Sequence, residues 1–168
     1  VRSCGDGILP IESCHLLPPQ HRQLPRALAG ALKFVSTRGA LQIQRVALRV
    51  SSRDEVSVNL WTSPGPFPRS AVARVLADST GATTVTRVIA RGPIERRDIS
   101  QVEVLSGPGA WVEMLGTDRY LVSAPSFFQV NTAAAELLRT IALGFLDADG
   151  ASAVADLYAG AGTFTLPM

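Results

Sequence analysis

The stretch DLYAGAGTF, residues 156–164, decides the fold class because it joins an apolar segment to a pair of glycines. The run SAVADLY (152–158) is short and largely apolar, which is typical of a strand buried in a parallel sheet. Gly160 and Gly162 follow at once, and glycine lets the backbone turn tightly and approach a ligand closely. A helix beginning after the turn offers free N–H groups to a carboxylate or phosphate. The stretch therefore predicts the opening of a doubly wound α/β domain, with a ligand at its glycine turn.

The residues around the turn favour one kind of ligand. A dinucleotide fingerprint, G-x-G-x-x-G, needs a third glycine where this chain has Thr165, and the Gly-Lys-Ser/Thr of a P-loop is absent. Asp156 suits a ligand with an ammonium group better than one with a pyrophosphate. S-adenosylmethionine carries an ammonium and a carboxylate group, so the turn indicates a methyltransferase. A dehydrogenase-type domain and a glycine turn that only packs remain as alternatives.

The residues before the turn alternate between helical and strand-like patterns. Helical spacing covers 21–37, 70–81 and 131–146, and strand-like runs cover 41–50, 55–61, 83–90, 100–107, 110–116 and 119–124. The short connections between the strands favour antiparallel hairpins. We therefore expect an α+β fold: a small central domain with a mainly antiparallel sheet, followed by the start of a Rossmann-like domain.

Composition limits the class of protein. Of the 168 residues, 46% are hydrophobic and 18% charged, which allows a real core. No apolar run approaches the roughly 20 residues of a membrane span, and the N-terminus lacks a signal-peptide pattern. Two cysteines are too few for a disulfide scaffold, so we expect a cytoplasmic protein, and we expect a monomer.

Arginine supplies 15 of the 16 basic side chains, and its planar fork suits phosphate. This permits a nucleic-acid partner without demonstrating one. The candidates for a phosphate contact are Arg87, Arg91, Arg96 and Arg97. Glu95 and Asp98 dilute their charge, so a solvated loop is the other interpretation.

Two motifs together carry a family resemblance. SFFQVNTAAAELL (126–138) precedes DLYAGAGTF (156–164), and this order resembles the RumA/TrmA-type RNA (uracil-5-)-methyltransferases. The family uses S-adenosylmethionine to methylate C5 of a uridine in ribosomal or transfer RNA. The resemblance implies that residues 1–125 are a central α+β domain and that 126–168 begin a class I methyltransferase domain. It is strong over about residues 116–168 and looser upstream.

The resemblance also implies roles for particular residues. The positions that match cofactor contacts are Gln129, Asp156, Tyr158, Gly160, Gly162 and Thr163. Phe127 matches a position that stacks near the target base of the RNA, as RNA enzymes hold extruded bases on aromatic faces. Packing without ligand contact is the alternative for Tyr158 and Phe127, and capping of a strand end is the alternative for Gln129.

Cys14 resembles the fourth cysteine of a [4Fe–4S] cluster found in many ribosomal-RNA members of the family. A cluster of this kind needs four thiolate ligands, and Cys4 does not supply the spacing of the other three. Cys14 is therefore either one ligand of a site completed elsewhere in a longer protein or an ordinary small residue.

No catalytic residue is assigned within the chain. The family's chemistry needs a cysteine nucleophile and a base, and both belong to a later part of the methyltransferase domain. We expect the chain to be a fragment of a larger enzyme and to be inactive alone. The alternatives are a non-catalytic RNA-binding module and a methyltransferase that acts on another substrate.

Overall fold

The computed structural model describes residues 11–37, 39, 41–92, 98–146 and 153–168. These residues form three α-helices, six strands and a short 3₁₀-helix. In chain order they are η1 (Pro19–His21), α1 (Leu24–Ser36), β1 (Ile43–Val50), β2 (Val56–Thr62), α2 (Arg69–Thr80), β3 (Thr84–Arg91), β4 (Asp98–Ser106), β5 (Ala110–Leu115), β6 (Asp118–Ser123) and α3 (Thr132–Leu146). Every helix and strand predicted before residue 147 is therefore present. Among the described residues, no helix has the length and apolarity that a membrane crossing needs.

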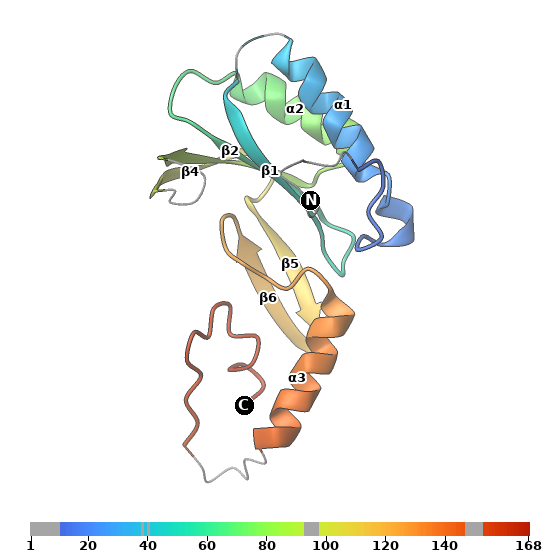
Figure 1. Ribbon diagram of the computed structural model, residues 1–168, viewed down its shortest axis with the longest axis vertical. Helices are drawn as coiled ribbons and strands as arrows, with labels where there is room; N and C mark the ends of the chain where they lie inside the picture. The colour runs from blue at the N-terminus through green and yellow to red at the C-terminus, as the bar shows by residue number, and fades with distance from the viewer. Residues whose placement is uncertain (1–10, 38, 40, 93–97, 147–152) are drawn as a thin grey trace, which may run out of the picture.

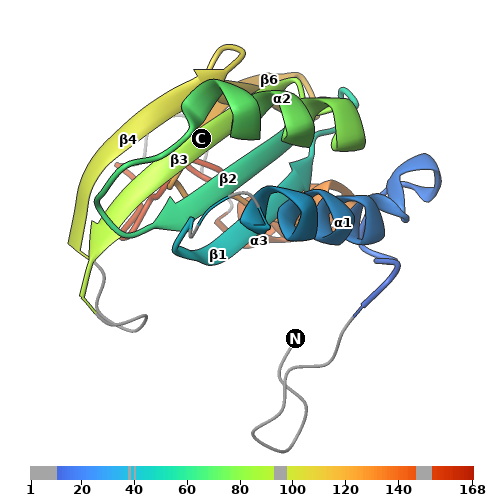
Figure 2. The same cartoon turned by 90° about the horizontal axis from the view of Figure 1, so that it is seen from above.

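The larger sheet has four strands in the order β1-β2-β3-β4. The pairs β1–β2 and β3–β4 are antiparallel, as predicted for a mainly antiparallel sheet. The pair β2–β3 is parallel, because α2 crosses over between the two strands and returns the chain to the same end of the sheet. Helices α1 and α2 cover one face of this sheet, and Figure 2 shows them side by side above it.

The covered face of the sheet forms the main core. Leu28 and Val35 of α1 and Leu76 of α2 pack with Val58 and Leu60 of β2, all of them buried. Val58 and Leu60 both reach this core because each β2 side chain that points to the helices alternates with one that points to the opposite face. Neither α1 nor α2 covers the opposite face of the sheet, which we call the open face, although its residues on β2 and β3 are buried.

The hairpin β5–β6 forms a second, smaller sheet that shares a core with α3. Figure 1 shows the hairpin and α3 below the four-stranded sheet. The core contains Trp111, Leu115, Tyr120, Val122, Phe128 and Ala135. It thus draws residues from both sides of the domain boundary expected at 125/126, and the boundary itself stays a prediction.

The start of α3 agrees with its predicted cap. The side-chain oxygen Oδ1 of Asn131 accepts a hydrogen bond from the backbone N–H of Ala134 at 3.0 Å. The apolar face predicted for this helix is uncovered, however, since Leu137 is 62% and Phe145 85% exposed. No described residue buries this face.

The strand predicted over 152–158 is not observed. Residues 153–158 have no strand conformation and are mostly exposed, and residue 152 lies outside the described residues. A strand needs backbone partners for its N–H and C=O groups, and none of the described strands lies beside this segment to supply them. The helix expected after the glycines is reduced to turns over 160–167, with a bond from Leu166 N–H to Gly162 O at 3.0 Å.

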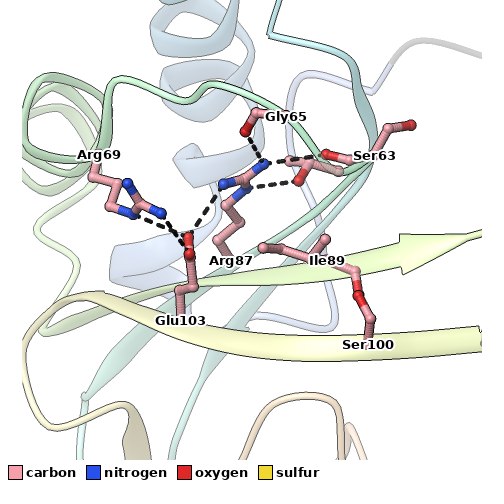
Figure 3. A network of polar contacts seen from close by, with 8 residues as sticks. Ser63, Gly65, Arg69, Arg87, Ile89, Ser100 and Glu103 are labelled. Atoms are coloured by element: carbon pink, nitrogen blue, oxygen red, sulfur yellow. Dashed lines mark hydrogen bonds and ion pairs between the residues drawn. The ribbon is translucent and has the colours of Figure 1, made fainter.

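Arg87 of β3 is the largest fully buried side chain, at 2% exposure. Its Nε donates to Thr62 Oγ1 at 2.8 Å, and its Nη2 donates to the carbonyls of Ser63 at 3.1 Å and Gly65 at 3.2 Å (Figure 3). The guanidinium also lies 4.3 Å from the ring centroid of Phe67. Arg87 therefore holds the loop between β2 and α2 in place.

Glu103 of β4 supplies the negative charge that balances this buried arginine. One carboxylate oxygen accepts from Arg87 Nη1 at 3.2 Å, and the carboxylate also binds Arg69 through its Nε and Nη2 atoms (Figure 3). Hydrogen bonding from Arg69, joined by that from Arg87, lowers the pKa of Glu103 although burial opposes the shift. The phosphate contact suggested for Arg87 is therefore wrong, because its donors are already used inside the fold. Arg91 is exposed, and Arg96 and Arg97 lie outside the described residues.

We expect Arg87→Ala to lower the free energy of unfolding by about 3 kcal/mol, because it leaves Glu103 and two loop carbonyls without their buried partner. Arg91→Ala removes an arginine from the exposed end of the same strand and should change stability by less than about 0.5 kcal/mol. Urea titration followed by circular dichroism measures both. Equal effects would show that the buried network contributes nothing.

The lowered pKa of Glu103 also makes stability depend on pH. A carboxyl whose folded pKa is depressed stabilises the fold above its unfolded pKa of about 4.3, and this stabilisation is lost as the pH falls through the folded value. The urea midpoint of Glu103→Gln should therefore change less between roughly pH 5 and pH 2 than that of the wild type. Asp78→Asn, on the exposed side of α2, is the matched control and should follow the wild type.

Candidate cofactor site

A cavity of about 950 Å³ lies between β6, the segment after it and the glycine turn. Arg119, Tyr120 and Phe127 line one side, while Gly160 and Gly162 line the other. This volume is at the upper end of the roughly 300–1,000 Å³ typical of small-molecule sites. We call it the glycine-turn cavity. The two sequence motifs thus meet across one hollow, although they are separate in the chain.

The backbone of the turn has the conformation that glycine favours. Gly160 has φ = 59° and Gly162 φ = 78°, both in the left-handed region. A β-carbon on Gly162 meets no atom within 4 Å, so the need for glycine there is conformational. Tyr158 also has positive φ, at 63°, with a fully exposed side chain. A non-glycine residue in this region is uncommon and is enriched at ligand sites.

Asp156 helps to close the turn. Its carboxylate oxygen Oδ2 accepts a hydrogen bond from Thr165 Oγ1 at 2.5 Å, which joins the residues on either side of the glycines. Asp156 does not itself line the glycine-turn cavity, and neither do Gln129, Tyr158 and Thr163. The structure therefore brings two of the six predicted cofactor residues, Gly160 and Gly162, to the cavity. The roles of the other four stay predictions.

Tyr120 also lines the cavity, and its hydroxyl group is buried. Tyr120 is 6% exposed, and among the described residues its hydroxyl has no hydrogen-bond partner. A buried hydroxyl normally has a partner, so a polar ligand next to Tyr120 would satisfy it. The residues present thus fit a cofactor with polar groups, of which S-adenosylmethionine is one.

The neighbouring residues Phe127 and Phe128 have different environments. Phe128 is 1% exposed and packs on Tyr120 with ring centroids 5.3 Å apart. Phe127 is 75% exposed at the wall of the cavity. Core packing was the alternative considered for Phe127, but none of the described residues buries its ring. Its ring is free to meet a ligand.

Arg49 of β1 fixes the segment that carries these phenylalanines. Its Nη1 donates to the carbonyl of Gln129 at 2.8 Å, and its Nη2 donates to the carbonyl of Phe128. Its guanidinium lies 5.4 Å from the ring centroid of Trp111. Burial lowers the pKa of Arg49, and the nearby carboxylate of Glu113 partly offsets this shift. The backbone of the motif is therefore held by an arginine almost eighty residues earlier.

The turn between β1 and β2 also binds β5 directly. Glu113 is 1% exposed, and its Oε1 accepts from the backbone N–H of Ser52 at 2.8 Å. The Ser52 hydroxyl accepts a hydrogen bond from the backbone N–H of Met114 at 3.0 Å. Glu55 Oε2 accepts one from the backbone N–H of Val112 at 2.6 Å. Sequence analysis did not identify Arg49 or Glu113, because no local pattern marks contacts between residues so far apart.

Cys14 is half-buried and lies among apolar residues such as Leu17 and Leu28. The described residues contain no group of three or more His, Cys, Asp or Glu side chains able to hold a metal ion. Cys4 lies outside the described residues. The two interpretations of Cys14 therefore both remain open.

Comparison with known proteins gives relatives of one kind. No family model matches the chain. A protein of Thermosynechococcus vestitus named as an uncharacterized RNA methyltransferase is 42% identical over 69 residues, which are 40% of this chain and 15% of the relative. A protein of Gloeobacter violaceus with the same description is 29% identical over 178 residues, which cover 96% of this chain and 37% of the relative.

A solved structure has a similar fold. The Pyrococcus abyssi tRNA (uracil-54, C5)-methyltransferase, in complex with S-adenosyl-L-homocysteine, superposes with a TM-score of 0.70 at 22% identity. The match covers 94% of this chain and 39% of that protein. The chain thus spans well under half the length of these relatives. Together they confirm the resemblance to RumA/TrmA-type RNA methyltransferases that the two motifs carry.

We expect Arg49→Ala to loosen residues 126–130, because two backbone carbonyls lose a charged donor worth about 1.5–3 kcal/mol. Amide hydrogen exchange in this segment should become about tenfold faster. Arg53→Ala, an exposed arginine in the adjacent turn, is the control and should leave the segment's exchange unchanged. Unchanged exchange in Arg49→Ala would mean that other contacts hold the motif.

Proposed function

We propose that this chain, whose sequence and fold relate it to the RumA/TrmA-type RNA methyltransferases, is part of an enzyme that methylates C5 of a uridine in ribosomal or transfer RNA. In this proposal residues 1–125 are the central domain and 126–168 begin the S-adenosylmethionine-dependent domain. The enzyme's remaining machinery lies in a longer protein, and the chain alone is inactive. Cys14, as one ligand of a [4Fe–4S] cluster in that protein, is a subordinate part of the proposal.

One observation carries the proposal: Phe127 and the glycine turn line the same cavity. Phe127 belongs to the motif assigned to the RNA base, and Gly160 and Gly162 belong to the motif assigned to the cofactor. A methyl transfer requires the base and the methyl donor to meet within bonding distance. A cavity that brings both motifs together supports this chemistry better than it supports either motif alone.

The residues of the chain have separable tasks in this proposal. When bound, S-adenosylmethionine supplies the methyl group to be transferred. Gly160 and Gly162 let the backbone approach it, and the hydroxyl of Tyr120 donates to a polar group of the ligand. The Gln129 amide can both donate and accept, and the exposed ring of Phe127 stacks on the target base. The attacking thiolate and the base that removes the C5 proton come from outside this chain.

The test uses the full-length polypeptide that contains this chain, with RNA carrying tritium at C5 of uridine. Methylation of C5 expels that proton, so S-adenosylmethionine-dependent release of tritium into water identifies the position of attack. We expect release from the full-length protein and none from the 168-residue chain. Methyl incorporation into RNA without tritium release would refute the C5 assignment, and the absence of both would leave the non-catalytic RNA-binding module as the better description.

A matched pair of variants tests the glycine turn. Gly162→Val places a β-branched residue at φ = 78°, which costs roughly 1–2 kcal/mol in this region, and should weaken S-adenosylmethionine binding about tenfold or more. Gly30→Val lies on an exposed part of α1, where a β-carbon meets no atom within 4 Å. Calorimetric titration of the full-length protein should give wild-type affinity for the second variant. Equal affinities for both would remove the turn from the cofactor site.

A further inference from the structure

A second hollow, of about 380 Å³, lies between the open face of the larger sheet and the segment after β6. Its walls include Arg45 and Arg49 of β1, Trp61 of β2, Trp111 of β5 and Phe127. We call it the sheet groove. The first motif supplies Ser126, Phe127 and Phe128 to its wall, but the cofactor assignment does not account for it.

Asn59 lines the groove and belongs to a buried row of polar side chains. Thr86 Oγ1 donates to Asn59 Oδ1 at 2.6 Å, and Asn59 Nδ2 donates to Ser57 Oγ at 3.2 Å. All three residues are buried, and Asn59 and Thr86 are partners across β2 and β3. A satisfied polar row of this kind fixes the position of the Asn59 side chain in the wall of the groove.

Arg45 is held in place at the wall of the groove. Its guanidinium lies 4.9 Å from the ring centroid of Trp61, which is itself buried. Arg45 is exposed, so the side of its guanidinium plane that faces away from Trp61 can contact a ligand. An arginine in this position can stack on a base or contact a phosphate.

The charges and donors of the groove favour an anionic, hydrogen-bonding occupant. Among the described residues, Arg45 and Arg49 line it and no carboxylate does; Arg49 already donates to the carbonyls of residues 128 and 129, so Arg45 is the arginine available to a ligand. Trp111 is 3% exposed, and its indole N–H has no hydrogen-bond partner among the described residues. A buried donor without a partner is uncommon, and an acceptor on a ligand is one way to satisfy it.

The groove and the glycine-turn cavity share a wall. Ser126 and Phe127 line both hollows. An RNA strand whose target base stacks on Phe127 in the glycine-turn cavity therefore has its neighbouring nucleotide next to the sheet groove. The groove's volume lies near the lower end of the range for small-molecule sites, which suits one unpaired nucleotide and excludes a duplex.

We infer that the sheet groove binds the nucleotide adjacent to the target uridine in single-stranded RNA, with Arg45 stacking on its base or pairing with its phosphate. The inference rests on the proposed function for the identity of the target. It assigns a substrate-positioning role to the central domain, in a groove that Arg91 does not line.

The test measures binding of a fluorescein-labelled twelve-nucleotide oligouridylate to the 168-residue chain by anisotropy at several salt concentrations. Arg45→Ala should weaken binding about tenfold, and the slope of log affinity against log salt should fall by about 0.7 if a phosphate contact is lost. Arg74→Ala is the matched control, because it removes an exposed arginine from α2 on the opposite side of the sheet. Its affinity should stay within twofold of the wild type.

A second variant separates stacking from charge. Arg45→Lys keeps the charge and removes the planar group, so it should restore the salt slope but only part of the affinity. Circular dichroism of each variant checks that the fold is retained. Equal affinities of Arg45→Ala and Arg74→Ala, no affinity of the wild type for the RNA at low salt, or displacement by oligoglutamate as effective as by RNA would each overturn the inference.

The outcomes for the groove and for the enzyme are distinguishable. If Arg45→Ala weakens RNA binding but the full-length protein releases no tritium from C5, the methyltransferase proposal fails and the groove remains an RNA site. If tritium is released and Arg45→Ala binds RNA and reacts like Arg74→Ala, the groove inference fails alone.

Discussion

The position of the candidate site depends on the polar contacts that join the turn between β1 and β2 to β5. Glu113 Oε1 accepts from the N–H of Ser52 in that turn, and the Ser52 hydroxyl accepts from the N–H of Met114 in β5. Arg49 donates to the carbonyls of Phe128 and Gln129. The two larger apolar cores are separate, since α1 and α2 cover the larger sheet while α3 packs on the hairpin. A small buried cluster of Trp61, Val88 and Ala124 joins the larger sheet to the segment after β6. The directional contacts therefore act together with this cluster to connect the sheet to the motif residues.

The hydrogen bonds between the β1–β2 turn and β5 fix the orientation of the hairpin more narrowly than apolar contacts would. Hydrogen bonds to charged groups contribute about 1.5–3 kcal/mol each and act only in a narrow range of geometry. Glu113 is buried, so its carboxylate must keep its donors or leave a charge unpaired in the interior. The hairpin is thereby held in one orientation against β1. Both the sheet groove and the glycine-turn cavity inherit their shape from that orientation.

The sequence predicted most of the fold because the elements up to residue 146 depend on local patterns. Alternating apolar residues marked the strands, and Asn131 marked the start of α3, where the structure finds the predicted cap. The segment at 153–158 shows the limit of such patterns, because an apolar run forms a strand only where another strand supplies hydrogen-bond partners. Arg87 shows another limit. An arginine near other arginines resembles a phosphate site, and only the fold reveals that Glu103 and two carbonyls already bind it.

The candidate site was predictable in part, for a reason visible in two adjacent residues. In extended backbone, successive side chains point to opposite sides, so one of Phe127 and Phe128 must face the core if the other faces outward. The sequence cannot say which, because both are phenylalanine. Contacts with the rest of the fold determine that Phe128 faces the core. Arg49 of the larger sheet donates hydrogen bonds to the carbonyls of residues 128 and 129, and Phe128 packs on Tyr120. Phe127 is then left at the wall shared by both hollows, and a shift of the segment by one residue would bury the ring and close that wall.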